Sequence, residues 1–212
     1  MLTLRPHQQR ALAALENNTH GQVIVPTGGG KTIIMIKDAE RRLTAATTPQ
    51  TIVVVAPRIL LANQLCDEFW TAFNGDVDAE FFHVHSGETS FGSSTKVQKI
   101  QCHDAVCKTA GIHQVIFTTY NSLRRIVEAG IDIDCIYYDE AHNSVRRDFF
   151  DSVLNVDAKS YYFFTATPKH TRSAYGRGMN NSMVYGPILE TVPAPELVNN
   201  GSILAPEVVS YE

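Results

Sequence analysis

Residues 25–32 read VPTGGGKT, and this stretch decides the fold. It follows a short apolar run at 22–25 and precedes an amphipathic stretch in which Ile34, Met35 and Ala39 share one helix face. Three consecutive glycines allow positive φ angles and a close approach of backbone amides to a polyphosphate. The N-terminus of the following helix adds free N–H groups and a dipole that favours anions. A strand, a glycine loop and a helix in this order predict a phosphate-binding site.

Two side chains at the end of the glycine loop carry the predicted chemistry. Lys31 would reach the β- and γ-phosphates of ATP, and Thr32 would offer its hydroxyl to Mg²⁺. The remaining cofactor-binding positions of the loop are Thr27, Gly28, Gly29 and Gly30. Val25 stands where the strict phosphate-loop pattern has a glycine, so a glycine turn with no phosphate role is the alternative.

On both sides of the loop, short apolar runs alternate with amphipathic stretches. The predicted strands are 22–25, 51–55, 81–84, 114–118, 135–138 and 161–165. The predicted helices are about 6–16, 31–43, 58–73, 95–109, 119–129 and 146–155. Several strands are apolar throughout, as in a parallel sheet that is covered on both faces. We therefore expect a doubly wound, mostly parallel α/β domain over 1–170, with a closing strand, loops and a linker over 171–212.

A second candidate site lies where a predicted strand ends in two carboxylates, in the stretch IYYDEAH at 136–142. In an open α/β sheet, ligands bind at the carboxyl ends of the strands, where the glycine loop also lies. We assign Asp139 to the Mg²⁺ ion and Glu140 to the attacking water. The alternative is a solvated Asp-Glu turn without a binding role. A phosphate loop on a neighbouring strand disfavours that alternative.

Composition limits the other function classes. The 212 residues carry a net charge of −4, so any contact with a polyanion has to be local. Four cysteines in a chain of this size are typical of reduced thiols, and neither a signal peptide nor an apolar run of about 20 residues is found. We expect an intracellular, cytoplasmic protein without a membrane partner. For a phage or viral protein this would be the host cytoplasm, and the nucleus is the alternative location.

Six motifs in order resemble the first RecA-like domain of superfamily 2 helicases and translocases of the DEAH/DExH type. They are LRPHQQ, PTGGGKT (motif I), VVVAPRILLANQ (motif Ia), TTYNSL (motif Ib), DEAH (motif II) and TATP (motif III). The motif sequences are most similar to those of the motor subunits of type I and type III restriction enzymes and of phage or viral DNA helicases. The resemblance implies an ATP-driven motor on nucleic acid, with DNA favoured over RNA.

The resemblance also implies roles for further residues. Gln8 would contact the adenine base of ATP, with Gln9 as the alternative. His142, Thr165 and Thr167 would couple the nucleotide state to the nucleic-acid groove. The expected contacts to one nucleic-acid strand are Pro57, Arg58 and Thr119, with Tyr120 and Asn121 as weaker candidates. Such contacts go to phosphates, so binding would be independent of sequence and sensitive to salt. An ordinary exposed arginine is the alternative for Arg58, and Arg124 and Arg125 are more simply a solvated helix face.

Family members complete the ATP site with arginines from a second RecA-like lobe, which the resemblance places after this one. We therefore expect a monomeric first lobe that is weakly active alone and hydrolyses ATP when the second lobe is supplied. A naturally truncated ATP- or nucleic-acid-binding regulator is the alternative.

A possible zinc set consists of His83, His85, Cys102, His103 and Cys107. The spacing between the cysteines is loose and no second close pair exists, so a structural explanation is favoured over zinc.

Overall fold

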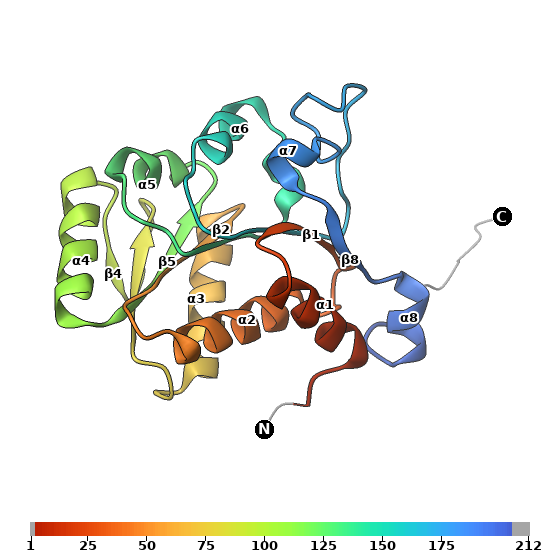
Figure 1. Cartoon of the computed structure of the whole chain (residues 1–212), viewed down its shortest axis with the longest axis horizontal. Coiled ribbons are helices and arrows are strands. Elements are labelled where there is room, and N and C mark those ends of the chain that lie inside the picture. Colours follow the sequence, from red (N-terminus) through yellow and green to blue (C-terminus); the bar gives the residue numbers. More distant parts are fainter. Residues whose placement is uncertain (1–2, 205–212) are drawn as a thin grey trace.

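The computed structural model describes residues 3–204, which form one eight-stranded sheet with parallel pairing throughout. The strand order is β4-β3-β5-β2-β6-β7-β1-β8 (Figure 1). The strands are β1 (His20–Ile24), β2 (Thr51–Ala56), β3 (Ala79–Val84), β4 (Gly92–Ser93), β5 (His113–Thr119), β6 (Cys135–Tyr138), β7 (Tyr161–Thr165) and β8 (Ile188–Thr191). Parallel strands need crossover connections, and helices supply them except between β3 and the two-residue β4, which are joined by the loop 85–91.

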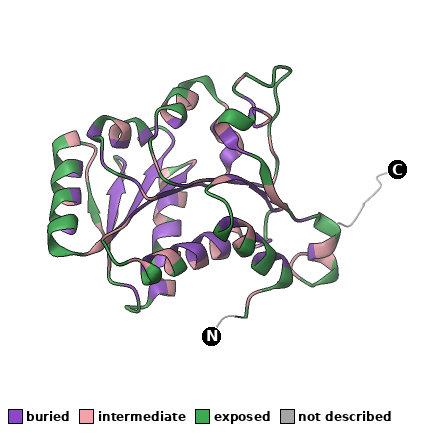
Figure 2. Cartoon of the chain, viewed as in Figure 1, coloured by how far each residue is buried: buried purple, intermediate pink, exposed green. Residues whose placement is uncertain are grey.

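Helices cover both faces of this sheet. One face carries α1 (Pro6–Glu16), α2 (Lys31–Ala45) and α3 (Ile59–Phe73), and the other carries α4 (Val97–Ala110), α5 (Leu123–Ala129), α6 (Arg147–Leu154) and α7 (Ser182–Tyr185) (Figure 1). A short 3₁₀ turn, η1 (Ala141–Asn143), follows β6, and α8 (Ala194–Asn199) follows the edge strand β8. Two separate apolar clusters, one on each face, form the core, and the central strands are buried along their whole length (Figure 2).

The predicted doubly wound α/β fold is confirmed, and each predicted strand and helix corresponds to an observed one within a few residues. The sequence did not predict β4, α7 and α8, which have only two, four and six residues. The closing strand expected after residue 170 is β8, which pairs with β1. Leu197 of α8 is fully buried, so the chain beyond residue 170 adds to the same core. The last part of the predicted linker, 205–212, lies outside the described residues.

Within residues 3–204, no helix is both long enough and apolar enough to cross a lipid bilayer.

Candidate active site

Three neighbouring strands bring the predicted motifs together at one edge of the sheet. In the order β6-β7-β1, the DEAH segment follows β6, the TATP segment follows β7 and the glycine loop follows β1. Because the strands are parallel, their carboxyl ends lie on the same side, which is where open α/β sheets bind ligands. The fold therefore assembles one site from segments more than 100 residues apart in the chain.

The glycine loop has the backbone shape that its composition predicts. Gly28 and Gly30 have φ angles of 81° and 84°, a region that favours glycine. Gly29 is buried, and a Cβ atom there would come within 2.5 Å of the Val25 side chain. Val25 is thus a core residue beneath the loop, which explains why a valine is accepted at this position. Side chains at these glycines would collide with the residues packed around the loop, so the loop needs glycine both for its φ angles and for its packing.

Lys31, the first residue of α2, extends to the DEAH segment. Its Nζ lies 3.1 Å from Oε1 of Glu140, and the lysine side chain is only 10% exposed. Glu140 has a φ of 45°, and only one other non-glycine residue among those described, Asn74, has a positive φ. This costly conformation turns the chain immediately after Asp139 and directs the carboxylate at Lys31.

Asp139 is buried at the end of β6, and its amide donates to the carbonyl oxygen of Val55 at 2.8 Å. Burial raises the pKa of its carboxyl to about 6; the negative charge of Glu140 adds to the shift, and the positive charge of Lys31 opposes it. A carboxylate and a threonine hydroxyl are oxygen donors of the kind that Mg²⁺ prefers. Asp139 directly follows β6 and Thr32 lies in the first turn of α2, after β1, so both stand at the carboxyl ends of the strands and their chemistry suits the predicted metal-binding pair.

His142 connects the DEAH segment to the TATP segment. Its Nδ1 lies 3.0 Å from the Thr165 hydroxyl and 3.4 Å from Oε2 of Glu140. The Thr165 hydroxyl also accepts a hydrogen bond from the amide of Thr167 at 3.2 Å. Burial lowers the pKa of His142, and the charges of Lys169 and Lys31 lower it further against the opposing effect of Glu140. The three predicted coupling residues thus lie together, because His142 and Thr167 both contact the Thr165 hydroxyl, and His142 also lies close to Glu140.

The two glutamines of the LRPHQQ segment have different environments. Gln8 is buried, its Oε1 accepts from the Arg5 amide at 2.9 Å, and its amide nitrogen lies against Gly30. Gln9 is exposed and donates to the carbonyl oxygen of Leu4. Of the two candidates for the adenine contact, only Gln8 lies against the phosphate loop.

Two residues beside the loop were not predicted from the sequence. His7 is fully buried, and its Nε2 lies 2.8 Å from the carbonyl oxygen of Gly29. Asn200 Nδ2 lies 3.4 Å from the other ring nitrogen of His7. The only sequence signal for His7 is its position next to Gln8, and nothing in the sequence marks Asn200.

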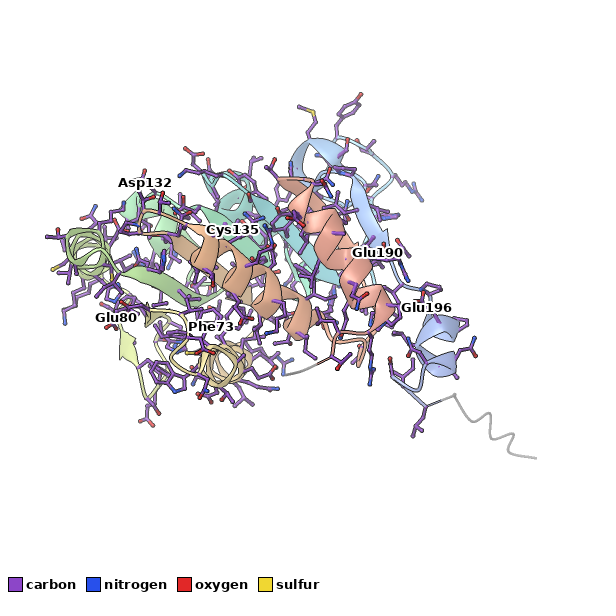
Figure 3. The ribbon with its side chains drawn as sticks, turned by 60° about the horizontal axis from the view of Figure 1, so that its bottom comes forward. Phe73, Glu80, Asp132, Cys135, Glu190 and Glu196 are labelled. Carbon is purple, nitrogen blue, oxygen red and sulfur yellow. The ribbon has the colours of Figure 1, made fainter. Side chains whose placement is uncertain are left out.

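The segment that contains α8 packs on the phosphate loop from outside. A Cβ atom at Gly28 would come 2.9 Å from Cγ2 of Ile203, and one at Gly29 would come 3.0 Å from Cδ1 of Leu197. Arg10 of α1 holds this segment through Glu196 at 2.9 Å and holds β8 through Glu190 at 3.2 Å. Figure 3 shows both glutamates on the side of the molecule where α8 follows β8.

The predicted nucleic-acid residues have mixed surroundings. Arg58 is exposed at the N-terminus of α3, next to the half-buried Pro57, and Asn121 is also exposed. Thr119 is buried, and its hydroxyl accepts from the Ser122 amide at 3.3 Å. Tyr120, a weaker candidate, is fully buried and donates its hydroxyl hydrogen to the carbonyl oxygen of Asp139 at 2.8 Å, so we assign it to the core beneath the DEAH turn.

Arg124 is exposed, and Arg125 forms an ion pair with Glu128 on the same helix at 2.8 Å. Both arginines have the solvated helical surroundings expected of them.

The residues of the possible zinc set do not come together. His83 Nδ1 and His85 Nε2 lie 2.9 Å apart, and His83 packs against Phe117 in the core on the α3 face. The ring of His103, in α4, stacks on Phe82 on the opposite face of the sheet. Cys107 lies near His103, and Cys102 is exposed. Among residues 3–204, no three histidine, cysteine or acidic side chains are grouped as metal ligands.

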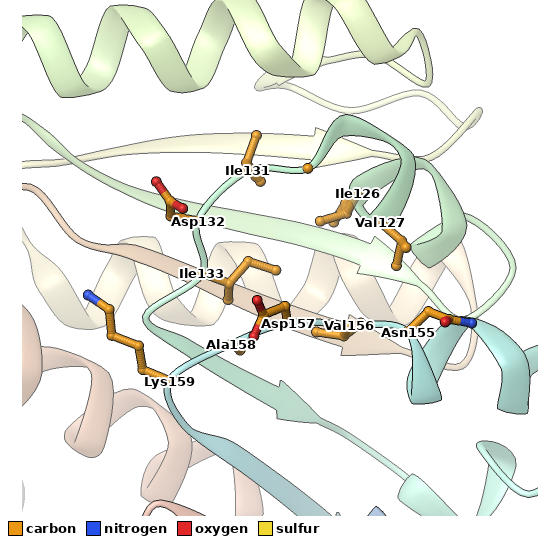
Figure 4. A pocket seen from close by; sticks show the side chains of 11 residues that line it. Ile126, Val127, Ile131, Asp132, Ile133, Asn155, Val156, Asp157, Ala158 and Lys159 are labelled. Carbon is orange, nitrogen blue, oxygen red and sulfur yellow. The ribbon is translucent and has the colours of Figure 1, made fainter.

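A cavity of about 300 Å³ lies away from this edge of the sheet (Figure 4). It is lined by 126–127, 130–133 and 155–159, which precede β6 and β7 in the chain. It therefore opens near the amino ends of the strands and takes no part in the site described above.

Comparisons with known proteins agree with this arrangement. Residues 1–170 match the family model described as "Type III restriction enzyme, res subunit". One curated relative, the endonuclease subunit of the type I restriction enzyme SsaAORF53P from Staphylococcus saprophyticus, is 22% identical over 210 residues. The alignment covers 96% of this chain and 21% of that relative, so the chain spans about a fifth of its length.

Solved structures share the fold. A nuclease-deletion mutant of the Type ISP restriction-modification enzyme LlaGI, in complex with a DNA substrate mimic, has a TM-score of 0.78 and 26% identity over 95% of this chain and 21% of that chain. The helicase domain of Hef from Pyrococcus furiosus has a TM-score of 0.60 and 20% identity over 86% of this chain and 37% of that chain.

The family model matches most of the chain, and the sheet, the glycine loop and the DEAH segment have the arrangement that the motif order predicts. The chain therefore belongs to the family of the type III restriction enzyme res subunit, and its fold is that of the N-terminal RecA-like domain of superfamily 2 helicases.

Proposed function

We propose that this chain is the ATP-binding lobe of a DNA-dependent motor, which grips one nucleic-acid strand and hydrolyses ATP to ADP and phosphate when a second RecA-like lobe completes the site. The observation that carries the proposal is the 3.1 Å ion pair between Lys31 of the phosphate loop and Glu140 of the DEAH segment. It joins the two halves of an ATP site that lie 109 positions apart in the sequence.

Each side chain has a distinct task in this proposal. The backbone of 27–30 and the ammonium of Lys31 bind the phosphates, while Thr32 and Asp139 hold Mg²⁺. When bound, Mg²⁺ neutralises charge on the β- and γ-phosphates. Glu140 orients the attacking water and accepts its proton. Because the triphosphate competes with Glu140 for Lys31, its binding releases this carboxylate for that task.

Gln8 and the hydrogen-bonded group of His142, Thr165 and Thr167 extend the site in two directions. Gln8 lies against Gly30, which supports a contact to the adenine of a nucleotide whose phosphates lie on the loop. His142 and Thr165 connect Glu140 to the segment after β7, so a change at the γ-phosphate can reach the surface. Pro57 and Arg58, at the start of α3, supply phosphate contacts to the nucleic-acid strand, and Thr119 is the third candidate.

The test is the ATPase rate of the chain alone and of the complete protein with its second lobe, each with single- and double-stranded DNA and RNA. We expect weak hydrolysis by the chain alone and stimulation by DNA in the complete protein. Glu140→Gln in the complete protein should bind ATP without hydrolysing it; normal hydrolysis by that variant would show that the assigned base is wrong. ATP binding without hydrolysis under every condition would instead support the regulatory module.

A further inference from the structure

A loop of unusual exposure follows the TATP segment. This segment, Lys169–Asn180, is called the 169–180 loop here, and it rises beside α7 as the blue loop at the top of Figure 1. Its two ends are joined by a backbone hydrogen bond of 2.7 Å from Met179 to Lys169. Gln22 of β1 donates to the carbonyl oxygen of the buried Met179 at 3.0 Å, and Tyr185 donates to that of Arg177 at 3.0 Å. The base of the loop is thus fixed to the core.

Hydrogen bonds inside the loop give its outer part a defined shape. Asn180 donates to the carbonyl oxygen of Thr171 and accepts from the Thr171 amide, both at 2.9 Å. Gly178 has no room for a Cβ atom against that amide. Beyond these contacts, Tyr175 is 84% exposed, the highest value for a large aromatic side chain among residues 3–204. Figure 2 shows the loop largely as exposed surface.

The charge around the loop has one sign. Residues 160–189 contain Lys169, Arg172 and Arg177 and no aspartate or glutamate, in a chain whose net charge is −4. Among the described residues, no carboxylate pairs with Lys169, Arg172 or Arg177. Residues 59–95, which include α3 and the outer strands β3 and β4, contain six carboxylates and no lysine or arginine. A polyanion is therefore favoured at the loop and repelled from the β3–β4 edge.

The position of the loop suits a nucleic-acid strand that also contacts Arg58. Arg58 follows β2, the loop follows β7, and only β6 lies between these strands. With a strand spacing of about 4.8 Å, the two segments begin on the order of 10 Å apart at the same edge of the sheet. A few nucleotides of a single strand span that distance.

We propose that the 169–180 loop is a second single-strand contact, in which Tyr175 stacks on a base while Arg172 and Arg177 bind the flanking phosphates. This inference rests on the proposed function and adds a base-stacking contact to it. An exposed aromatic ring between two cations is the combination that binds single strands with little sequence preference, because every base has a flat face. Inside a duplex each base face is covered by the neighbouring base pairs, so a stacking contact along the strand selects single strands.

The test is fluorescence anisotropy of the full chain with a labelled oligodeoxythymidylate and with a strand of the same length that lacks bases. Loss of one stacking contact of about 1–3 kcal/mol predicts that Tyr175→Ala weakens binding to the first strand by roughly 5- to 150-fold. Tyr175→Phe keeps the ring and should remain within about twofold. Binding to the strand without bases should be the same for all three proteins, which a general folding defect would not produce.

Met183→Ala serves as the matched control, because Met183 is 79% exposed on the neighbouring helix α7 and lies outside the loop. Arg172→Gln and Arg177→Gln should each reduce the slope of log affinity against log salt by about 0.7. Equal affinities of Tyr175→Ala and the unchanged chain for the oligodeoxythymidylate would overturn the loop contact alone. Absence of binding by the unchanged chain would count against the loop and also against nucleic-acid binding in the proposed function.

Discussion

His7 donates its Nε2 hydrogen to the carbonyl oxygen of Gly29 across 2.8 Å, which ties the first helix to the middle of the phosphate loop. The donor is assigned to His7 because a carbonyl oxygen only accepts. The second ring nitrogen is then left to accept from Asn200, in the segment that packs on the loop from outside. A fully buried imidazole thus holds the phosphate loop through a backbone carbonyl oxygen.

His7→Phe should weaken nucleotide binding, because the ring keeps its volume and leaves the Gly29 carbonyl oxygen unpaired. An unpaired buried acceptor costs about 1–3 kcal/mol, so we expect a loss of roughly 5- to 150-fold in affinity for a fluorescent ATP analogue if the loop is distorted by that amount. Gln9→Ala is the control, since Gln9 is the exposed neighbour. Unchanged affinity of His7→Phe would mean that the loop keeps its shape without this bond.

Lys31→Ala should abolish binding of the same analogue. The variant removes the ammonium proposed to bind the β- and γ-phosphates and leaves Glu140 without its 3.1 Å partner. Lys37→Ala is a matched control on the same helix, because Lys37 forms an ion pair with Glu40 at 2.5 Å. Binding is measured by equilibrium titration. Equal affinities of the two variants for the analogue would show that Lys31 does not bind the phosphates.

Thr165→Val should separate ATP binding from its stimulation by nucleic acid. The substitution keeps the shape of the side chain and removes the hydroxyl that lies 3.0 Å from His142. In the complete protein we expect ATP affinity to change less than twofold and DNA-stimulated ATPase to fall about tenfold, the effect of one lost hydrogen bond of roughly 1.4 kcal/mol. Thr165→Ser should restore most of the rate. A Thr165→Val protein with normal stimulation would argue against coupling through His142.

The positions of most strands and the segments that form the candidate site were predictable from the sequence because their signals are local. The glycine loop and the DEAH segment each occupy fewer than ten consecutive residues, and the buried strands are apolar throughout. His7 and Asn200 were not predictable, since they meet only when segments 193 positions apart fold together. The burial of Tyr120 under the DEAH turn likewise depends on how β5, β2 and β6 align, which no sequence pattern reveals.

Asp38→Ala should destabilise the fold strongly. Asp38 is fully buried on α2, where it accepts hydrogen bonds from Arg41 at 2.6 Å, from Arg42 at 2.7 Å and from Tyr137 at 2.7 Å. Removing one member of a buried charged group costs about 3–5 kcal/mol, which urea unfolding followed by circular dichroism can measure. Arg41→Gln is the control, because the Arg41 side chain is 39% exposed and Asp38 keeps its hydrogen bonds to Arg42 and Tyr137 in that variant. Similar losses for the two variants would contradict this assignment.

His83 should make the chain sensitive to acid. Burial, with a smaller contribution from the charge of His85, lowers the pKa of His83 from 6.5 to about 4. Between these two values the unfolded chain binds the proton and the folded chain does not, so stability is fully present above pH 6.5 and is lost as the pH falls toward 4. The shift corresponds to about 3 kcal/mol.

His83→Phe should therefore flatten the dependence of unfolding free energy on pH between 6.5 and 4. A phenyl ring suits the site, since His83 packs against Phe91 and Phe117 and its Nε2 has no partner among the described residues. The exposed His170, changed to Gln, should leave the pH profile as it was. An acid profile that is the same with and without His83 would locate the sensitivity elsewhere.

The strand that carries the phosphate loop pairs with the two strands that come latest in sequence among those described. β1 pairs only with β7 and β8 among the described strands, so its partners span residues 161–191. A ribosome adds about 5–20 residues per second, and β2, β5, β3 and β6 can begin to pair while β1 still waits for a neighbour. The strand that carries the phosphate loop therefore gains its neighbours only after β7 and β8 have been made, and a nascent chain that stops before β7 has a phosphate loop in its sequence but no neighbouring strand to hold it.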